Sequence, residues 1–330
     1  MTHYPAVLAW IRPSAIIMSI LALACGGLFL AMTLSGCGSD QGEGASGENE
    51  YADDMAEQHE GDTPEASAAA REPAIPVTAE EVEYMTMDGG DAVTGYMAAP
   101  SNPDSVLAAR GMDPEADALP GVVVIHEWWG LNENIRTATR RLAGEGYRVL
   151  AVDLYAGSTA ETPDEARSLM QDAMQDTGRL AANLSTANDY LKMETGAPRT
   201  AVMGWCFGGA MTLTASMAQP EGYAGAVVYY GRVEGITEEE VQPISFPVIG
   251  FFGADDGGIP VESVRAFEST MNDAGKDIDI HVYDGAGHAF ANPSGTRYDA
   301  DAAEDAWDKT TAFLQERLYG ADEAASTDAP

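Results

Sequence analysis

Short runs of apolar residues alternate with stretches that repeat apolar residues at helical spacing between about residue 80 and residue 320. The clearest run, GVVVI at 121–125, is continuous and β-branched, which is typical of a strand buried on both faces. The pattern predicts strands at 82–87, 92–98, 121–125, 147–152, 200–204, 225–230, 248–252 and 277–283, and helices at 134–144, 162–192 (one or two), 207–217, 261–275 and 300–319.

This alternation predicts a single α/β domain over residues 78–320, built as a doubly wound, mostly parallel sheet with helices on both faces. The first two strands are expected to pair antiparallel. In such a sheet, functional groups gather at the carboxyl ends of the strands.

The two ends of the chain have a different composition. Residues 1–37 contain an apolar stretch at 15–34 that ends in Leu34-Ser35-Gly36-Cys37. This ending resembles the bacterial lipobox, which predicts a signal peptide and lipidation of Cys37. An uncleaved membrane-spanning helix is the alternative, since the run has about 20 residues. We therefore expect an exported, lipid-anchored protein of the bacterial cell envelope, on the periplasmic or outer face.

Residues 38–77 are rich in Gly, Ser, Glu, Asp and Ala, and they predict a disordered acidic linker. Residues 321–330 predict a disordered tail of the same kind. The chain carries 53 Asp and Glu against 17 Lys and Arg, a formal net charge of -36. Such a charge disfavours nucleic acid as a partner. It is compatible either with a high-salt habitat or with a generally acidic secreted protein. We expect a monomer.

Cys206 is the single cysteine of the predicted domain, because Cys25 and Cys37 lie in or beside the apolar run. The residues around it, Gly204-Trp205-Cys206-Phe207-Gly208, follow a predicted strand and precede a predicted helix. This is the cysteine version of a nucleophile elbow, in which glycines on both sides permit a sharp turn. A helix start also favours a thiolate. The alternative is a small buried hydrophobic residue.

A cysteine nucleophile needs a base, and the chain has five histidines. His3 lies in the predicted signal, His59 in the predicted linker and His281 within a strand pattern. His288 lies in a glycine-rich loop just beyond the last predicted strand, where this kind of sheet places its catalytic histidine. His126 suggests a metal ligand, but no second histidine or cysteine stands at ligand spacing. We expect no metal and no cofactor.

The partner carboxylate of His288 is expected after the strand at 248–252, where Asp255 and Asp256 stand side by side. Either gives the chain order nucleophile, acid, histidine. The spacing does not choose between them.

The strand at 121–125 ends in His126-Glu127-Trp128-Trp129. The loop after such a strand commonly supplies one amide of an oxyanion hole, and the residue after the nucleophile supplies the other. The candidates are the backbone amides of Trp128 and Phe207. Glu127 is an acid at an apolar strand end, which favours a functional carboxylate.

Five motifs together resemble the dienelactone hydrolase family, over about residues 80–318: HEWWG at 126–130, DLY at 153–155, GWCFGG at 204–209, Gly253-x-x-Asp256 with Ile259-Pro260, and GHAF at 287–290. The resemblance implies an α/β-hydrolase fold and favours Asp256 over Asp255. It also implies that Glu127 keeps the cysteine unreactive in the absence of substrate and accepts its proton when substrate binds.

The sequence departs from the founding enzymes of this family at two places. Gly157 and Asn292 stand where those enzymes bind the lactone's carboxylate with arginines. A neutral ester or lactone therefore fits better than dienelactone as the substrate.

The sequence predicts a cysteine-nucleophile hydrolase of small carboxylic esters or lactones, with Cys206, Asp256 and His288 as its catalytic residues. One alternative is a non-catalytic binding lipoprotein on a hydrolase scaffold, against which the intact set of residues argues. Another is a serine-peptidase-like relative, which the cysteine at the elbow disfavours.

Overall fold

The structure is a computed structural model that describes residues 53, 55–56, 58–63, 71–87 and 89–320. All of them belong to one compact unit, Gly42–Pro330. Within these ranges no helix has the length and apolar character needed to cross a membrane. The predicted signal peptide, its lipobox with Cys37, and the predicted tail at 321–330 lie outside the described residues.

An eight-stranded sheet forms the core of the unit, in the order β1-β2-β4-β3-β5-β6-β7-β8. The pairs β1–β2 and β2–β4 are antiparallel, and the remaining neighbours are parallel. The prediction of a mostly parallel α/β sheet with an antiparallel opening pair is confirmed. The strands are β1 (Val77–Thr86), β2 (Ala92–Pro100), β3 (Gly121–Ile125), β4 (Arg148–Ala151), β5 (Thr200–Trp205), β6 (Gly225–Tyr229), β7 (Val248–Gly253) and β8 (Ile278–Tyr283).

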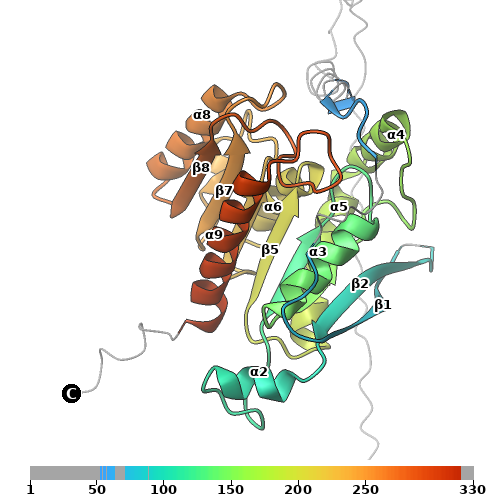
Figure 1. Cartoon of the computed structure of the whole chain (residues 1–330), viewed down its shortest axis with the longest axis vertical. Helices are drawn as coiled ribbons and strands as arrows, with labels where there is room; N and C mark the ends of the chain where they lie inside the picture. Colours follow the sequence, from blue (N-terminus) through green and yellow to red (C-terminus); the bar gives the residue numbers. More distant parts are fainter. Residues whose placement is uncertain (1–52, 54, 57, 64–70, 88, 321–330) are drawn as a thin grey trace, which may run out of the picture. The chain divides into compact units, whose positions relative to one another are not determined.

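Helices cover both faces of this sheet. In Figure 1, α3 and α9 cross in front of the strands, whereas α5 and α6, which pack against each other, lie behind them. The helices are α2 (Pro103–Ala109), α3 (Glu133–Gly144), α4 (Pro163–Met174), α5 (Thr177–Met193), α6 (Phe207–Ala218), α7 (Glu238–Val241), α8 (Val261–Asp273) and α9 (Ala300–Tyr319).

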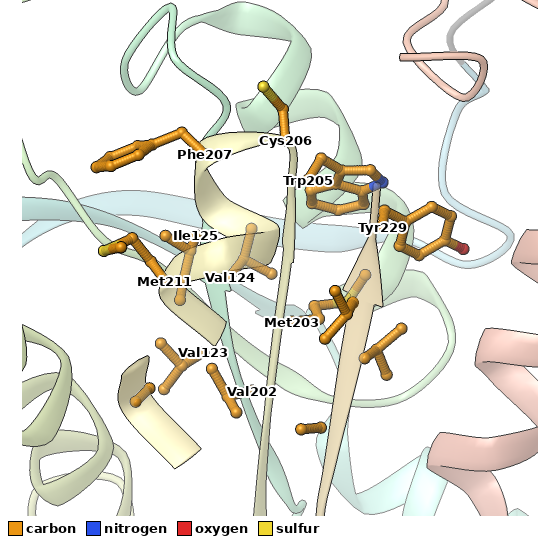
Figure 2. Packing of buried hydrophobic residues seen from close by; sticks show 14 of the residues in the cluster. Val123, Val124, Ile125, Val202, Met203, Trp205, Cys206, Phe207, Met211 and Tyr229 are labelled. Atoms are coloured by element: carbon orange, nitrogen blue, oxygen red, sulfur yellow. The ribbon is translucent and has the colours of Figure 1, made fainter. Parts of the chain in front are cut away.

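The central strands are fully buried, which explains their continuous apolar runs. Figure 2 shows side chains of β3 and β5, among them Val123 and Val202, packed together beneath the turn that carries Cys206. The register pairs Ile125 with Gly204 and Trp205 with Tyr229. The loops that follow β3, β5 and β6 consequently leave the sheet at one edge.

Part of the predicted linker packs into the domain instead of remaining disordered. Residues 53, 55–56 and 58 are helical, and the side chains of Met55 and His59 are completely buried. Asp53 forms an ion pair with Arg167 of α4, with nitrogen and oxygen 2.8 Å apart. The expectation of a disordered linker over 38–77 is therefore corrected for residues 53, 55–56 and 58–63, where Asp53 and Asp62 have partners on the domain.

Candidate active site

Cys206 occupies the turn between β5 and α6, and its backbone is strained. Its φ of 55° and ψ of -119° are uncommon for a residue with a side chain. A Cβ at Gly204 would overlap the backbone of Gly208, and a Cβ at Gly208 would overlap the carbonyl oxygen of Ile125. Both neighbours must therefore be glycine for the turn to close. Figure 2 shows the Cys206 side chain at this junction, between those of Trp205 and Phe207.

His288 and Asp256 form a buried pair next to this turn. The Nδ1 atom of His288 lies 2.7 Å from Oδ2 of Asp256, and neither side chain is exposed. The other oxygen, Oδ1 of Asp256, accepts hydrogen bonds of 2.9 Å from the backbone amides of Gly258 and Ile259. Asp255, the neighbouring candidate, is exposed. The structure thus brings Asp256, and not Asp255, to the histidine.

The sulfur of Cys206 lies close to two imidazoles. One ring nitrogen of His288, one of His59 and the Cys206 sulfur all lie within 4.8 Å of one another. Since Nδ1 of each ring is bonded to an aspartate, Nε2 is the nitrogen left to face the sulfur. Neither Nε2 atom has a hydrogen-bond partner among the described residues.

Burial and charge oppose each other at Cys206. Burial by itself would raise the pKa of the thiol, but the positive field of His288, with further contributions from its contact and that of His59, lowers the pKa to about 6. Burial likewise opposes the imidazolium of His288, yet Asp256 and Cys206 together raise the pKa of His288 to about 10. Between these values the centre holds a thiolate next to an imidazolium.

Glu127 lies at the end of β3 with its carboxylate buried. Asn292 donates a hydrogen bond of 2.7 Å to Oε2, and the hydroxyl of Tyr230 donates a longer one of 3.4 Å to Oε1. Burial, and secondarily the negative charge of Cys206, raise the pKa of Glu127 to about 7. This acid can therefore exchange a proton near neutral pH.

The two predicted oxyanion amides lie at the same edge of the sheet. Phe207 is the first residue of α6, so its N–H has no partner within the helix. Trp128 follows β3, whose last residue, Ile125, pairs with Gly204 of β5. The positions are compatible with an oxyanion hole beside the sulfur.

A family model described as the dienelactone hydrolase family matches residues 107–318. The chain belongs to this family. The fold and the motif residues agree with this assignment. The protein is thus an enzyme of a hydrolase family. In its structure Cys206, His288 and an acid lie near one another.

Individual relatives within the dienelactone hydrolase family cover most of the domain. The chain is 33% identical over 206 residues to the protein usf of Aquifex pyrophilus, covering 60% of this chain and 89% of that protein. It is 30% identical over 243 residues to an Escherichia coli K12 protein provisionally named a carboxymethylenebutenolidase, covering 69% and 88%. A crystal structure of a provisionally assigned dienelactone hydrolase from Klebsiella pneumoniae gives a TM-score of 0.63 at 26% identity, covering 73% and 99%.

Two other described histidines of the chain contact the backbone or neighbouring side chains of the fold. His126 is buried, with Nδ1 at 2.6 Å from the carbonyl oxygen of Glu127 and Nε2 accepting from the amide of Leu154 at 3.1 Å. His281 stacks on Phe251 and lies 3.1 Å from a carboxylate oxygen of Asp279. With both nitrogens of His126 engaged by the backbone, this residue is suited to fixing loops rather than binding metal.

His59 is the site residue that the sequence analysis missed. The sequence does not single it out, because it stands in a stretch with the composition of a linker. The available signal was short: Met55 and His59 are spaced four residues apart, and Asp62 follows three residues later. That spacing places an apolar and a polar group on one face of a helical turn.

His59, Cys206 and His288 are also a group that could hold a metal ion, judged among the described residues. An ion bound there would take the sulfur and both imidazoles away from hydrolysis.

A cavity of about 90 Å³ lies on the other side of Glu127. Asn292 lines this cavity and donates the hydrogen bond to Glu127. Arg141 also lines it, with its guanidinium 3.7 Å from the ring centroid of Trp307. Arg71 lines the cavity as well and pairs with Glu304 at 2.7 Å, so two cations are present in the cavity wall at positions that the motifs did not indicate.

Proposed function

We propose that this member of the dienelactone hydrolase family is a cysteine hydrolase of small carboxylic esters or lactones. Cys206 is the nucleophile, His288 the acid and base, and Asp256 the residue that orients His288. The proposal rests chiefly on one observation: the buried Asp256–His288 pair, 2.7 Å apart, lies beside the sulfur of the strained elbow.

The reaction has two halves. The Cys206 thiolate attacks the ester carbon, a C–S bond forms, and the carbonyl electron pair moves onto oxygen. When this adduct collapses, the C–O bond to the leaving group breaks and the alkoxide takes the Nε2 proton of His288. Neutral His288 then accepts a proton from water as the water oxygen attacks the thioester. The second collapse breaks the C–S bond and returns the thiolate.

The neighbouring groups stabilise this course. The amides of Trp128 and Phe207 are assigned to the negative oxygen of each adduct. Asp256 accepts the Nδ1 proton of His288 and so directs Nε2 toward the reaction. Because the pKa of Cys206 is lowered to about 6, the sulfur has lost its proton at neutral pH, and Glu127 is not required to take it.

The substrate is assigned as a small ester or lactone. The relatives named carboxymethylenebutenolidases support lactones as a class. Gly157 and Asn292 replace the expected arginines, which favours a neutral substrate, whereas Arg141 and Arg71 place two cations in the wall of the neighbouring cavity. A panel of lactones and aryl esters, each with and without a carboxylate, separates these two influences through kcat/KM.

The decisive test is Cys206→Ala with p-nitrophenyl acetate. We expect turnover to disappear while the melting temperature falls by only a few degrees, because losing one sulfur atom from a buried site costs about 1 kcal/mol. His281→Gln is the matched control and should keep wild-type turnover. Retained turnover in Cys206→Ala would refute the cysteine mechanism. Absence of turnover in the wild type on the whole panel would favour a non-catalytic binding protein.

The location of the enzyme is a separate part of the proposal. We propose that the chain is exported and anchored by lipid at Cys37, on the strength of the lipobox-like sequence Leu34-Ser35-Gly36-Cys37.

A further inference from the structure

Several described residues between positions 53 and 63 contact the catalytic centre. Met55 is completely buried and lies against Gly258, in the turn that follows Asp256. With its amide oriented to suit its neighbours, Gln58 donates to Oδ1 of Asp256 at 3.3 Å and accepts from the amide of Gly258 at 2.8 Å. This segment therefore touches the acid of the proposed triad directly.

His59 and Asp62 repeat the arrangement of His288 and Asp256. The Nδ1 atom of His59 lies 2.7 Å from Oδ2 of Asp62, the same separation as in the His288 pair, and both side chains are buried. Asp62 is held in turn by the amide of Thr296 at 2.6 Å and by the guanidinium of Arg297 at 3.4 Å. The carboxylate is thus built into the domain and does not depend on the segment alone.

Arg297 links the two pairs. Its Nε donates a hydrogen bond of 3.0 Å to the carbonyl oxygen of His288, while its other end reaches Asp62. The ring of His59 packs on Trp128, with centroids 4.6 Å apart, and stands edge-on to His288 at 5.5 Å. These contacts leave Nε2 of His59 facing the sulfur, with no other partner among the described residues.

From this geometry we infer that His59, held by Asp62, is a second catalytic imidazole that shares the Cys206 thiolate with His288. The inference rests on the proposed cysteine mechanism and deepens it. Asp62 acts through His59 and is a positioning residue.

Two imidazoles can perform two tasks that a single imidazole could not perform at the same time: exchanging a proton and keeping a positive charge. His288 must give up its proton to the leaving alkoxide and later take one from water, so it cannot stay positive throughout. His59 keeps a positive charge opposite the sulfur while that exchange occurs. The charge stabilises the thiolate before attack and makes it a better leaving group when the thioester collapses.

The surrounding charges are consistent with a protonated His59. Burial opposes its imidazolium, but Asp62 and the sulfur outweigh burial and raise the pKa of His59 above its ordinary value. The titratable or charged groups that surround the sulfur are His59, His288, Glu127, Tyr155 and Tyr230, with Asp62 and Asp256 behind the imidazoles. Arg297 adds a third positive group next to Asp62, so the two imidazolium ions and the guanidinium together face the thiolate, Asp62 and Asp256.

The experiment compares His59→Gln and Asp62→Asn with His281→Gln as the matched control, all in the full chain. Ultraviolet absorbance of the thiolate gives the pKa of Cys206 without any substrate, and kcat/KM for p-nitrophenyl acetate gives the acid limb. In His59→Gln we expect the pKa of Cys206 and the midpoint of the acid limb of kcat/KM against pH to rise by about one pH unit, which is about a tenfold weaker preference for thiolate. We also expect kcat to fall about 10²-fold. Asp62→Asn should move both in the same direction by less.

Several outcomes would overturn the inference. An unchanged thiolate titration in a folded His59→Gln would make His59 a packing residue, and a rise in turnover would make residues 53–63 a mere obstruction. Bound metal in stoichiometric amount in the purified enzyme, with turnover gained on chelation, would make the three residues an ion site. If His59→Gln does not fold, Asp62→Asn decides by the same titration. Each of these leaves the Cys206→Ala test intact, whereas retained turnover in Cys206→Ala refutes the mechanism itself.

Discussion

Asp255 and Asp256 are neighbours in the chain, but their surroundings differ in every respect. Asp256 is buried and accepts from two backbone amides and from His288, whereas Asp255 is exposed. We predict that Asp256→Asn lowers kcat/KM for p-nitrophenyl acetate about 10³- to 10⁴-fold, because an amide favours the wrong tautomer of the histidine. Asp255→Asn, the control, should be nearly silent. Equal losses in the two variants would mean that both carboxylates shape the loop.

The opposed pKa shifts of Cys206 and His288 predict a bell-shaped pH profile. Below about pH 6 the thiol holds its proton and cannot attack, and above about pH 10 His288 loses the proton that the leaving group needs. We therefore expect kcat/KM to rise through the first value and fall through the second.

Glu127→Gln provides the control for this profile. Because the pKa of Glu127 is about 7, its negative charge is largely absent at the acid limb and present at the alkaline limb. The variant should therefore move the alkaline limb to lower pH, since Glu127 no longer supports the imidazolium of His288, and leave the acid limb nearly unchanged. An acid limb that moves to higher pH would show that Glu127 assists ionisation of the sulfur, as the family resemblance implied.

The turn between β5 and α6 can form because Gly204 and Gly208 have no side chains. A Cβ at Gly208 would collide with the backbone oxygens of Ile125 and His126, and backbone cannot move aside as a flexible side chain can. We predict that Gly208→Ala lowers the free energy of unfolding by about 1–3 kcal/mol, as overpacking does, and abolishes turnover by displacing Cys206. Thermal unfolding and the esterase assay measure both effects.

Gly178→Ala is the matched control for this substitution. Gly178 lies in the first turn of α5, where a Cβ would make only an ordinary contact with Asp176. Because alanine favours the helix over glycine, this variant should keep full activity with equal or slightly higher stability. Wild-type behaviour of Gly208→Ala would show that the elbow relaxes more readily than its geometry indicates.

The sequence predicted those elements that show a pattern of apolar residues or a motif within a short stretch of the chain. Each parallel strand is buried on both faces and so appears as a continuous apolar run, and the loops after β5, β7 and β8 carry Cys206, Asp256 and His288 in family spacing. The region at 162–192 left one or two helices open. The structure has two, because Asp176 accepts from the amide of Arg179 and caps the start of α5.

Residues 53–63 and α7 could not be predicted in this way. α7 has only four residues, fixed by a capping box between Thr237 and Glu240, which is too short to show a period. His59 and Asp62 are polar residues in an acidic stretch, and their partners, Thr296 and Arg297, stand more than two hundred positions away. No local pattern reports a polar contact between such distant parts of a chain.

The proposed lipid anchor at Cys37 would join the catalytic domain to a membrane. We predict that metabolic labelling with palmitate tags the wild-type protein and not Cys37→Ser, since the lipobox cysteine is the acylated residue. Cys25→Ser is the matched control, because Cys25 lies within the apolar run and should leave labelling unchanged. Label that survives in Cys37→Ser would place the acyl chain elsewhere, and membrane association without any label would favour an uncleaved apolar helix.

The complete burial of Cys206 affects how oxidation inactivates the enzyme over time. A thiolate is the form of cysteine that peroxides convert to sulfenic acid and then to irreversible oxides. Here Cys206 is completely buried, and the ring of His59, which lies tilted against that of Trp128, stands beside the sulfur. An oxidant, like a substrate, must therefore displace part of this cover to reach the sulfur. Oxidative damage should therefore accumulate with the number of turnovers completed rather than with the time the protein has spent in solution.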